Sequence, residues 1–169
     1  GFGVIKLGDK YSSKININKI IKKNMYFDYA HSNFKSEIND ILVILHSTFH
    51  VATPSGLSFI PMIFNKKTYW TNMNTCSQSL GYNYGDVTIF KKIKFIKNSK
   101  NINLKYYFKE PLDHNNQIND FKINGYKSIN NTSIEILNCF DDFYKLNVSN
   151  KKIDDTQIRL LMNSTNYSY

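Results

Sequence analysis

Cysteine is scarce in this sequence, and the spacing of metal-binding motifs is missing. Of 169 residues only Cys76 and Cys139 are cysteines, and they lie far apart with no Cys-x-x-Cys pair. Such usage is typical of reduced, buried thiols in a cytosolic protein rather than of a disulfide-stabilised secreted domain. The four histidines show no zinc-ligand spacing, and no Asp-x-Asp pair stands near the turn described below. We therefore expect a cytoplasmic protein that uses neither a metal ion nor a cofactor.

Long apolar runs are also missing. The run Ile41–Leu45 is far shorter than the ~20 residues that a membrane-spanning helix requires. The sequence thus predicts no membrane span, and it leaves open peripheral contact with the inner face of the membrane. Its first residue is Gly1 and its first residues already resemble a strand, so we expect a fragment with more protein upstream.

Arginine is nearly absent despite a formal charge of +9, since 22 basic residues include a single arginine, Arg159. A strong positive charge is one sign of a nucleic-acid-binding protein. Here the lysines are scattered along the chain, and the joint excess of Lys, Asn and Ile is typical of an AT-rich genome. We expect solvated lysines and no nucleic-acid partner, with a basic nucleic-acid-binding domain kept as an alternative.

What the sequence does contain is an alternation of strand-like and helix-like segments. Its 41% hydrophobic residues suffice for a core, and no internal repeat is visible. Ile38, Ile41, Leu42 and Leu45 have helical spacing, and Ser32 or Asn33 could cap that helix. Alternation with short loops predicts an α/β fold whose parallel strands are joined by crossover helices. The strands expected in one sheet are 2–7, 25–29, 49–53 and 67–71, with helices near 35–46 and 57–64.

The second half of the chain is less regular. Residues 86–97 fit a strand or a helix, residues 101–124 look irregular except for a short helix near 104–110, and residues 125–129 could form a last strand. Thr132 and Glu135 have the spacing of a capping box, and Ile136, Cys139, Phe140 and Phe143 form one apolar stripe. We expect C-terminal helices over about 132–165.

The turn Thr53-Pro54-Ser55-Gly56-Leu57-Ser58 stands where a strand becomes a helix. In parallel sheets ligands bind at the carboxyl ends of the strands, and unpaired N–H groups at a helix start attract anions such as phosphate. Gly56 would allow close approach or an unusual dihedral, and the serines offer hydroxyls. The alternative is an ordinary turn with a serine cap. Gly-x-Ser-x-Gly and the P-loop pattern are absent, which argues against a hydrolase nucleophile elbow and a P-loop ATPase.

Three segments together resemble a family of bacterial glycosyltransferases of surface-polysaccharide and lipopolysaccharide biosynthesis, and more distantly the fucosyltransferases. They are "GFGVIKLGD", "FDYAHSNFKSEINDILVILHSTFHVATPSGLSFIPMIFNKKTYWTN" and "DVTIFKKI". The resemblance covers about Gly1 to Ile93. It implies the C-terminal, donor-binding half of a two-domain enzyme of the GT-B type, with a Rossmann-like parallel sheet and an acceptor half missing upstream.

The resemblance also implies partners and site residues. The partners are a nucleotide-diphosphate sugar as substrate and a glycan or lipid-linked acceptor. Lys6 stands where the family usually has Arg, and Ala52 where it commonly has Gly. The donor-binding residues are expected to be Lys6, Gly8, Asp9, Asp28, Tyr29, His31, Ser32, Ser55, Gly56, Leu57 and Ser58.

Each role has a plain structural alternative. Lys6 could hold the diphosphate or be a solvated lysine, and Asp9 could bind sugar hydroxyls or cap a turn. Tyr29 could stack on the base or pack in the core, while His31 could contact phosphate. The catalytic base is unknown from the sequence, with His31 and Asp9 as candidates. A non-catalytic nucleotide-binding module is the alternative to an enzyme.

Overall fold

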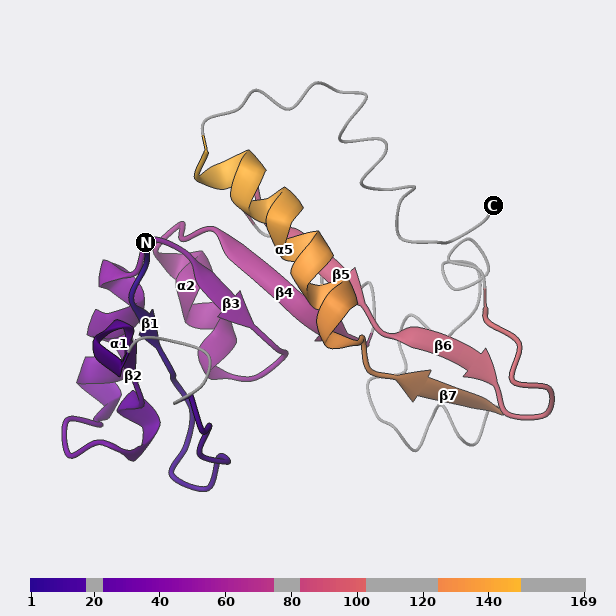
Figure 1. Cartoon of the computed structure of the whole chain (residues 1–169), viewed down its shortest axis with the longest axis horizontal. Coiled ribbons are helices and arrows are strands. Elements are labelled where there is room, and N and C mark those ends of the chain that lie inside the picture. Colours follow the sequence, from indigo (N-terminus) through magenta and orange to yellow (C-terminus); the bar gives the residue numbers. More distant parts are fainter. Residues whose placement is uncertain (18–22, 75–82, 103–124, 150–169) are drawn as a thin grey trace. The chain divides into compact units, whose positions relative to one another are not determined.

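The computed structural model describes residues 1–17, 23–74, 83–102 and 125–149 (Figure 1). The chain divides into two compact units, Gly1–Ser47 and Thr48–Tyr169. We call them the first and the second unit and describe each by itself.

The first unit contains a short parallel strand pair. Strand β1 pairs with β2 in parallel, and the ladder continues past the strands as the Lys6 N–H donates to the Phe27 carbonyl at 2.9 Å. The Ala30 N–H donates in turn to the Lys6 carbonyl at 3.1 Å. This ladder fixes the carboxyl ends of both strands next to each other. The elements are β1 (Val4–Ile5), a 3₁₀ turn (Lys23–Met25), β2 (Tyr26–Phe27), a second 3₁₀ turn (Tyr29–His31) and α1 (Glu37–His46).

Helix α1 differs from the sequence prediction in its cap and in its buried face. Its N-cap is Ser36, whose Oγ accepts a hydrogen bond from the Asn39 N–H, so the prediction of Ser32 or Asn33 was wrong. Ile44 is fully buried, whereas Ile38 is 71% exposed and Leu42 43% exposed. The predicted helical spacing is confirmed, and Ile44, which was not among the spaced residues, is the buried residue of this helix.

The second unit is built on a parallel three-stranded sheet in the order β3-β4-β5. The 3₁₀ turn Leu57–Phe59 and helix α2 (Ile60–Ile63) connect β3 to β4, as predicted for a crossover. The α/β prediction is confirmed, but the prediction of one continuous sheet was wrong because β1 and β2 form a separate two-stranded sheet. Alternation indicates which segments are strands, whereas the pairing partner depends on distant contacts. The strands are β3 (His50–Ala52), β4 (Thr68–Met73) and β5 (Val87–Phe90).

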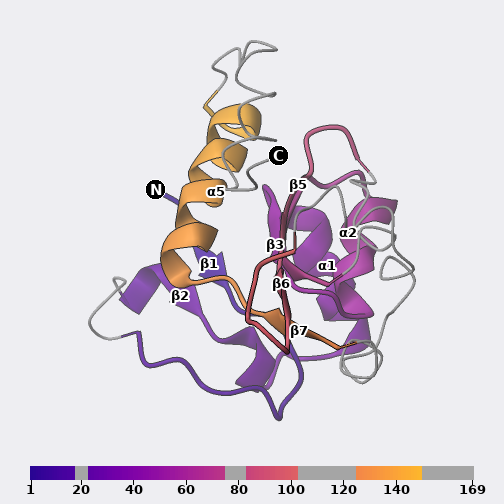
Figure 2. The same ribbon diagram turned by 90° about the vertical axis from the view of Figure 1, so that its right-hand side faces the viewer.

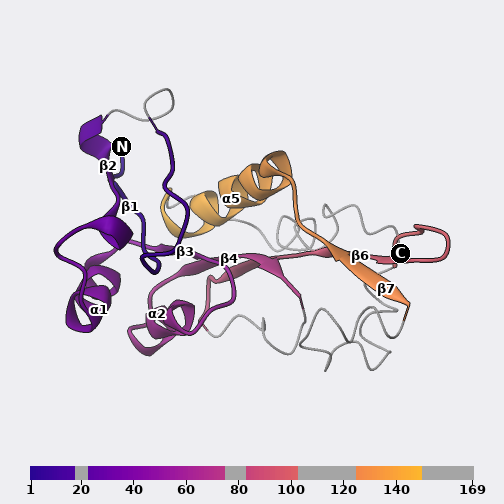
Figure 3. The same ribbon diagram turned by 90° about the horizontal axis from the view of Figure 1, so that it is seen from below.

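Apolar clusters cover both faces of this sheet, and Figure 3 shows α2 below it and α5 above it. On one face Trp70 and Met73 pack with Ala52 and with Phe59 from the turn before α2. On the other face Tyr69 and Ile89 pack with Phe143 of α5. Successive residues of a strand point to opposite faces, so Tyr69 and Trp70 serve the two clusters in turn.

Helix α5 (Ser133–Asn147) is confirmed together with its capping box. The Thr132 Oγ1 accepts from the Glu135 N–H at 3.3 Å, and the Glu135 carboxylate accepts from the Thr132 N–H at 2.8 Å. The predicted stripe also packs as expected, since Ile136, Cys139, Phe140 and Phe143 all belong to the cluster on this face of the sheet.

An antiparallel two-stranded ribbon completes the second unit. Figure 2 shows the chain turned by 90° from the view of Figure 1. Strands β6 (Lys92–Phe95) and β7 (Tyr126–Ile129) pair around a small cluster of Ile93, Ile102 and Tyr126. The segment that fitted either a strand or a helix is therefore two strands, β5 and β6. Several predictions lie outside the described residues: those on Cys76 and Arg159, the short helix near 104–110, and the helical part beyond 149.

Candidate functional site

Three of the predicted donor-binding residues come together at the carboxyl ends of β1 and β2. The His31 Nδ1 lies 2.9 Å from Asp28 Oδ2, and the Lys6 Nζ lies 3.8 Å from Asp28 Oδ1. The exposed fractions of these side chains are 14% for Lys6, 22% for Asp28 and 16% for His31. One carboxylate thus stands between an ammonium group and an imidazole in a half-buried setting.

Lys6 is already held by its own neighbours. Its ammonium donates to the Ser12 Oγ at 3.2 Å and to the Ser13 carbonyl at 2.5 Å. Lys6 is therefore not the freely solvated lysine of the structural alternative. To contact a phosphate, its ammonium would have to add to or exchange these contacts.

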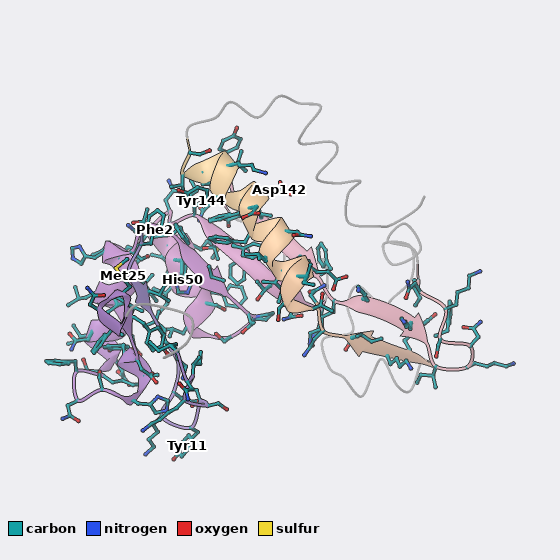
Figure 4. All side chains as sticks on the ribbon, viewed as in Figure 1. Phe2, Tyr11, Met25, His50, Asp142 and Tyr144 are labelled. Carbon is teal, nitrogen blue, oxygen red and sulfur yellow. The ribbon has the colours of Figure 1, made fainter. Side chains whose placement is uncertain are left out.

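The turn after β1 is organised by Gly8 and Asp9. Gly8 has φ +145°, and a Cβ there would come within 3.3 Å of the Ser12 Oγ, which explains why glycine stands at this position. The Asp9 Oδ1 accepts from the Tyr11 N–H at 2.8 Å, and the Asp9 carbonyl accepts from the Ser12 hydroxyl. This carboxylate caps a turn, the alternative left open for it. Tyr11 itself points into solvent (Figure 4) and is 83% exposed.

Tyr29 and Ser32 serve the local structure. Tyr29 is 2% exposed, and its hydroxyl bonds both the N–H and the carbonyl of Ser36 at 3.1 Å. Burial raises the pKa of the Tyr29 hydroxyl above its usual range. The Ser32 Oγ donates to the Tyr29 carbonyl and accepts from the Phe34 N–H. Burial of Tyr29 favours core packing over stacking on a base.

The predicted phosphate-binding turn lies in the second unit, between β3 and α2. Ser58 is buried, and its hydroxyl donates to the Ser55 carbonyl at 2.6 Å while it accepts from the Ser55 N–H at 2.8 Å. This reciprocal pair closes the turn, so the Ser58 hydroxyl is a structural group. Ser55 is exposed and Leu57 is half-buried.

Gly56 is the open position of this turn. It has φ −55°, in the right-handed helical region, so the turn does not use the unusual dihedral that glycine would allow. A Cβ built on Gly56 would meet nothing within 4 Å. At the start of the following helix the Ser58 N–H bonds the Ser55 carbonyl at 3.2 Å, while the N–H groups of Gly56 and Leu57 have no partner among the described residues. Two backbone donors of the turn therefore lack a described acceptor.

Sequence reasoning missed two asparagines at the carboxyl edge of the sheet. Asn72 has φ +54° within β4, where the register with β5 shifts, and its Oδ1 accepts from the Asn131 N–H at 2.7 Å. The Asn131 side chain donates to the Phe90 carbonyl at 2.8 Å, and its Oδ1 is buried without a partner. Bulges and left-handed residues are frequent near functional sites. The Thr-Asn strand end in the resembling segment was the one available signal for Asn72.

The predicted set is thus divided between the two units, with Lys6 to Ser32 in the first and Ser55 to Ser58 in the second. Within the described ranges, no three His, Cys, Asp or Glu side chains group as metal ligands do. No helix in the described part of the chain combines the length and the hydropathy of a membrane span.

The candidate site was also compared with known proteins, and its interpretation rests on its geometry and on the sequence resemblance. No protein-family model, curated protein or solved structure matches the chain.

Proposed function

We propose that this chain binds a nucleotide-diphosphate sugar and forms the donor half of a glycosyltransferase that builds a surface polysaccharide or lipopolysaccharide. The observation that carries the proposal is the turn between β3 and α2. It combines an exposed Ser55, an open Gly56 and two N–H groups that no described residue accepts from, at the carboxyl end of a parallel strand. Ligands of open α/β sheets bind at this end.

The proposed chemistry is transfer of the sugar to a hydroxyl of a glycan or lipid-linked acceptor. The departing nucleoside diphosphate gains charge in the transition state, and preorganised donors stabilise such charge. The N–H groups of Gly56 and Leu57 are suited to this role. Lys6 belongs to the other unit, and its expected contact with a diphosphate rests on the sequence resemblance alone. We propose a reaction without metal ion or cofactor. The GT-B arrangement, with a Rossmann-like donor half, is part of the same proposal.

A non-catalytic nucleotide-binding module is the second candidate. One observation favours it, because several hydroxyls of the predicted set serve the protein itself: those of Tyr29, Ser32 and Ser58 all bond the backbone. Such a module would bind the nucleotide sugar without transferring the sugar. Measuring sugar release from the bound donor separates the two candidates.

The first experiment is a thermal-shift screen of the full chain with nucleoside diphosphates and nucleotide sugars. A ligand that binds the native state raises the melting temperature as its concentration grows, by about 2.7 kcal/mol of stability at one hundred times Kd. We expect a nucleotide sugar to do so. Salt-dependent affinity for arbitrary oligonucleotides, with no response to any nucleotide, would instead favour a nucleic-acid-binding domain.

Gly56→Val tests whether the turn is the phosphate site. The valine side chain would occupy the open space beside the two free donors, so calorimetry should show donor affinity lower by about tenfold or more, the scale of one lost charge-assisted hydrogen bond. Circular dichroism should remain that of the wild type, because φ −55° suits any residue. Gly3→Val is the matched control, since a Cβ there also meets nothing within 4 Å. Equal affinity in the two variants would show that the turn is only a bend.

A further inference from the structure

The Asp28 and His31 side chains form an oriented pair of ionisable groups in the first unit. Asp28 is the N-cap residue of the 3₁₀ turn Tyr29–His31, and the His31 N–H donates to the Asp28 carbonyl at 3.3 Å. The side chains meet a second time, through the 2.9 Å contact of His31 Nδ1 with Asp28 Oδ2. A backbone bond and a side-chain bond together fix the direction of the imidazole ring.

This contact selects one tautomer of neutral His31. An ionised carboxylate accepts hydrogen bonds and donates none, so the proton lies on Nδ1 and the lone pair on Nε2. Nε2 has no hydrogen-bond partner among the described residues and is not one of their buried unpaired atoms. Nε2 is therefore open to a solvent or substrate proton.

Lys6 places a positive charge beside the Asp28 carboxylate. Its ammonium lies 3.8 Å from Asp28 Oδ1, the carboxylate oxygen that is buried without a hydrogen bond. Lys6 is itself held in place by its bonds to Ser12 and Ser13. The two oxygens of Asp28 thus face different partners, Oδ1 the ammonium and Oδ2 the imidazole.

The geometry distinguishes the two candidate bases that the sequence left open. The Asp9 carboxylate already accepts the Tyr11 N–H at 2.8 Å as part of a turn. His31 has its inner nitrogen oriented by a carboxylate and its outer nitrogen free. That is the arrangement in which a histidine acts as general base, with the carboxylate holding its tautomer.

We propose that Asp28 and His31 form a proton-accepting dyad, with Asp28 as the positioning residue and the Nε2 of His31 as the base. Its substrate rests on the proposed function and is the hydroxyl group of the glycan or lipid-linked acceptor. As the hydroxyl oxygen forms its bond to the anomeric carbon, its proton passes to Nε2. The bond from the anomeric carbon to the phosphate oxygen breaks, and its electron pair leaves with the nucleoside diphosphate. The imidazolium then returns its proton to water.

The first test of the dyad needs no nucleotide. Two-bond ¹H–¹⁵N correlation spectra of the full chain at pH 8, where an ordinary imidazole is neutral, report which ring nitrogen carries the proton. His31→Gln assigns the signal by its loss. We expect the Nδ1–H tautomer in the wild type and a shift toward Nε2–H in Asp28→Asn, with exposed His46 unchanged in both. An Nε2–H tautomer in the wild type overturns the dyad.

A second measurement tests the openness and basicity of Nε2. Diethyl pyrocarbonate acylates an accessible neutral imidazole nitrogen, and peptide mass spectrometry follows each histidine separately. We expect His31 to react in the wild type and about tenfold or more slowly in Asp28→Asn, as expected for the wrong tautomer. His46 is the internal control and should react equally in both proteins. A His31 that stays unmodified while His46 reacts overturns the proposal.

The last measurement separates the dyad from the proposed function. With a nucleotide sugar that passes the thermal screen, at a concentration that saturates each protein, His31→Gln should lower the rate of sugar release or transfer by roughly 10²–10⁴-fold. A loss no greater than that of His46→Gln overturns the catalytic role of His31. If no nucleotide sugar binds while the tautomer and acylation results hold, the dyad stands and its assignment to a glycosyltransferase falls. If a donor binds but the tautomer is reversed, the dyad falls and the proposed function stands.

Discussion

In the second unit Tyr69 and Phe143 are 0% exposed, whereas in the first unit the side chains of β1 are 45% and 48% exposed. The second unit covers both faces of its sheet with aromatic and aliphatic side chains. The first unit relies on ladder bonds and on polar contacts around Lys6, Asp28 and Tyr29. The comparison teaches that the ionisable cluster of Lys6, Asp28 and His31 lies in the unit whose strands are more exposed.

The largest expected effect on stability comes from a substitution in the core of the second unit. Phe143→Ala removes a side chain that contacts Tyr69 and Phe49 with ring centroids 5.8 and 5.5 Å away, so unfolding should lose about 3–5 kcal/mol. Urea denaturation measures the loss. Leu137→Ala, on the same helix but 58% exposed, is the control and should stay within about 0.5 kcal/mol of the wild type. Similar losses in both variants would show that α5 does not pack as described.

His50 of β3 gives the second unit a dependence on pH. Burial lowers the pKa of the His50 imidazole from 6.5 to about 4. Between these values the unfolded chain binds the proton more strongly, so stability falls as pH drops from 6.5 toward 4, by at most about 3 kcal/mol. His50→Gln should flatten this part of the stability curve, measured as thermal unfolding against pH. His46→Gln is the exposed control, and an equal flattening there would contradict the assignment.

Two glycines of the second unit should respond in opposite ways. Gly85 has φ +92°, and a Cβ there would collide with Asn147 and come within 3.3 Å of Lys67 Cδ, so Gly85→Ala should cost about 2 kcal/mol. Gly56→Ala should stay within about 1 kcal/mol of the wild type, on the stabilising side, because its φ and its open surroundings suit alanine. Chemical denaturation of both variants makes the comparison, and a reversed order would refute the described turn geometries.

The smallest effect is expected in the first unit, and it sharpens the comparison. Tyr29→Phe deprives the Ser36 N–H of its acceptor at the start of α1, at a cost of about 1 kcal/mol. Hydrogen exchange should speed up at Ser36 and the neighbouring amides while the amides of β4 keep their rates. Tyr11→Phe, at an 83% exposed position, is the control. Unchanged exchange at Ser36 in Tyr29→Phe would contradict the bond.

Local signals in the sequence predicted local structure well. The capping box of Thr132 and Glu135 and the apolar stripe of α5 are set by residues three or four apart, and both were confirmed. The crossover from β3 through α2 to β4 was confirmed for the same reason, since its loops are short. Helical spacing predicted α1, but it did not predict that Ile44 is buried while Ile38 is exposed.

The candidate site was predictable in part. Lys6, Asp28 and His31 could be expected together because they follow two strands that pair in parallel. The bonds that occupy Lys6 and Ser58 could not be expected, because they depend on the exact conformation of the turns containing Ser12 and Ser55. Asn131 was also beyond prediction, since it bonds Asn72 and Phe90, which precede it by 59 and 41 positions.

The position of Asn131 affects how much the segment before it can vary in length. Its amide holds the Phe90 carbonyl at 2.8 Å although the two residues are 41 positions apart. The segment between Phe90 and Asn131, which contains β6 and β7, therefore leaves the three-stranded sheet and returns to it at the same place. Because the entropy of closing such a loop grows only slowly with its length, the segment can be lengthened, shortened or exchanged at little cost to the sheet. The ends of this segment, Phe90 and Asn131, are joined directly by the Asn131 side chain.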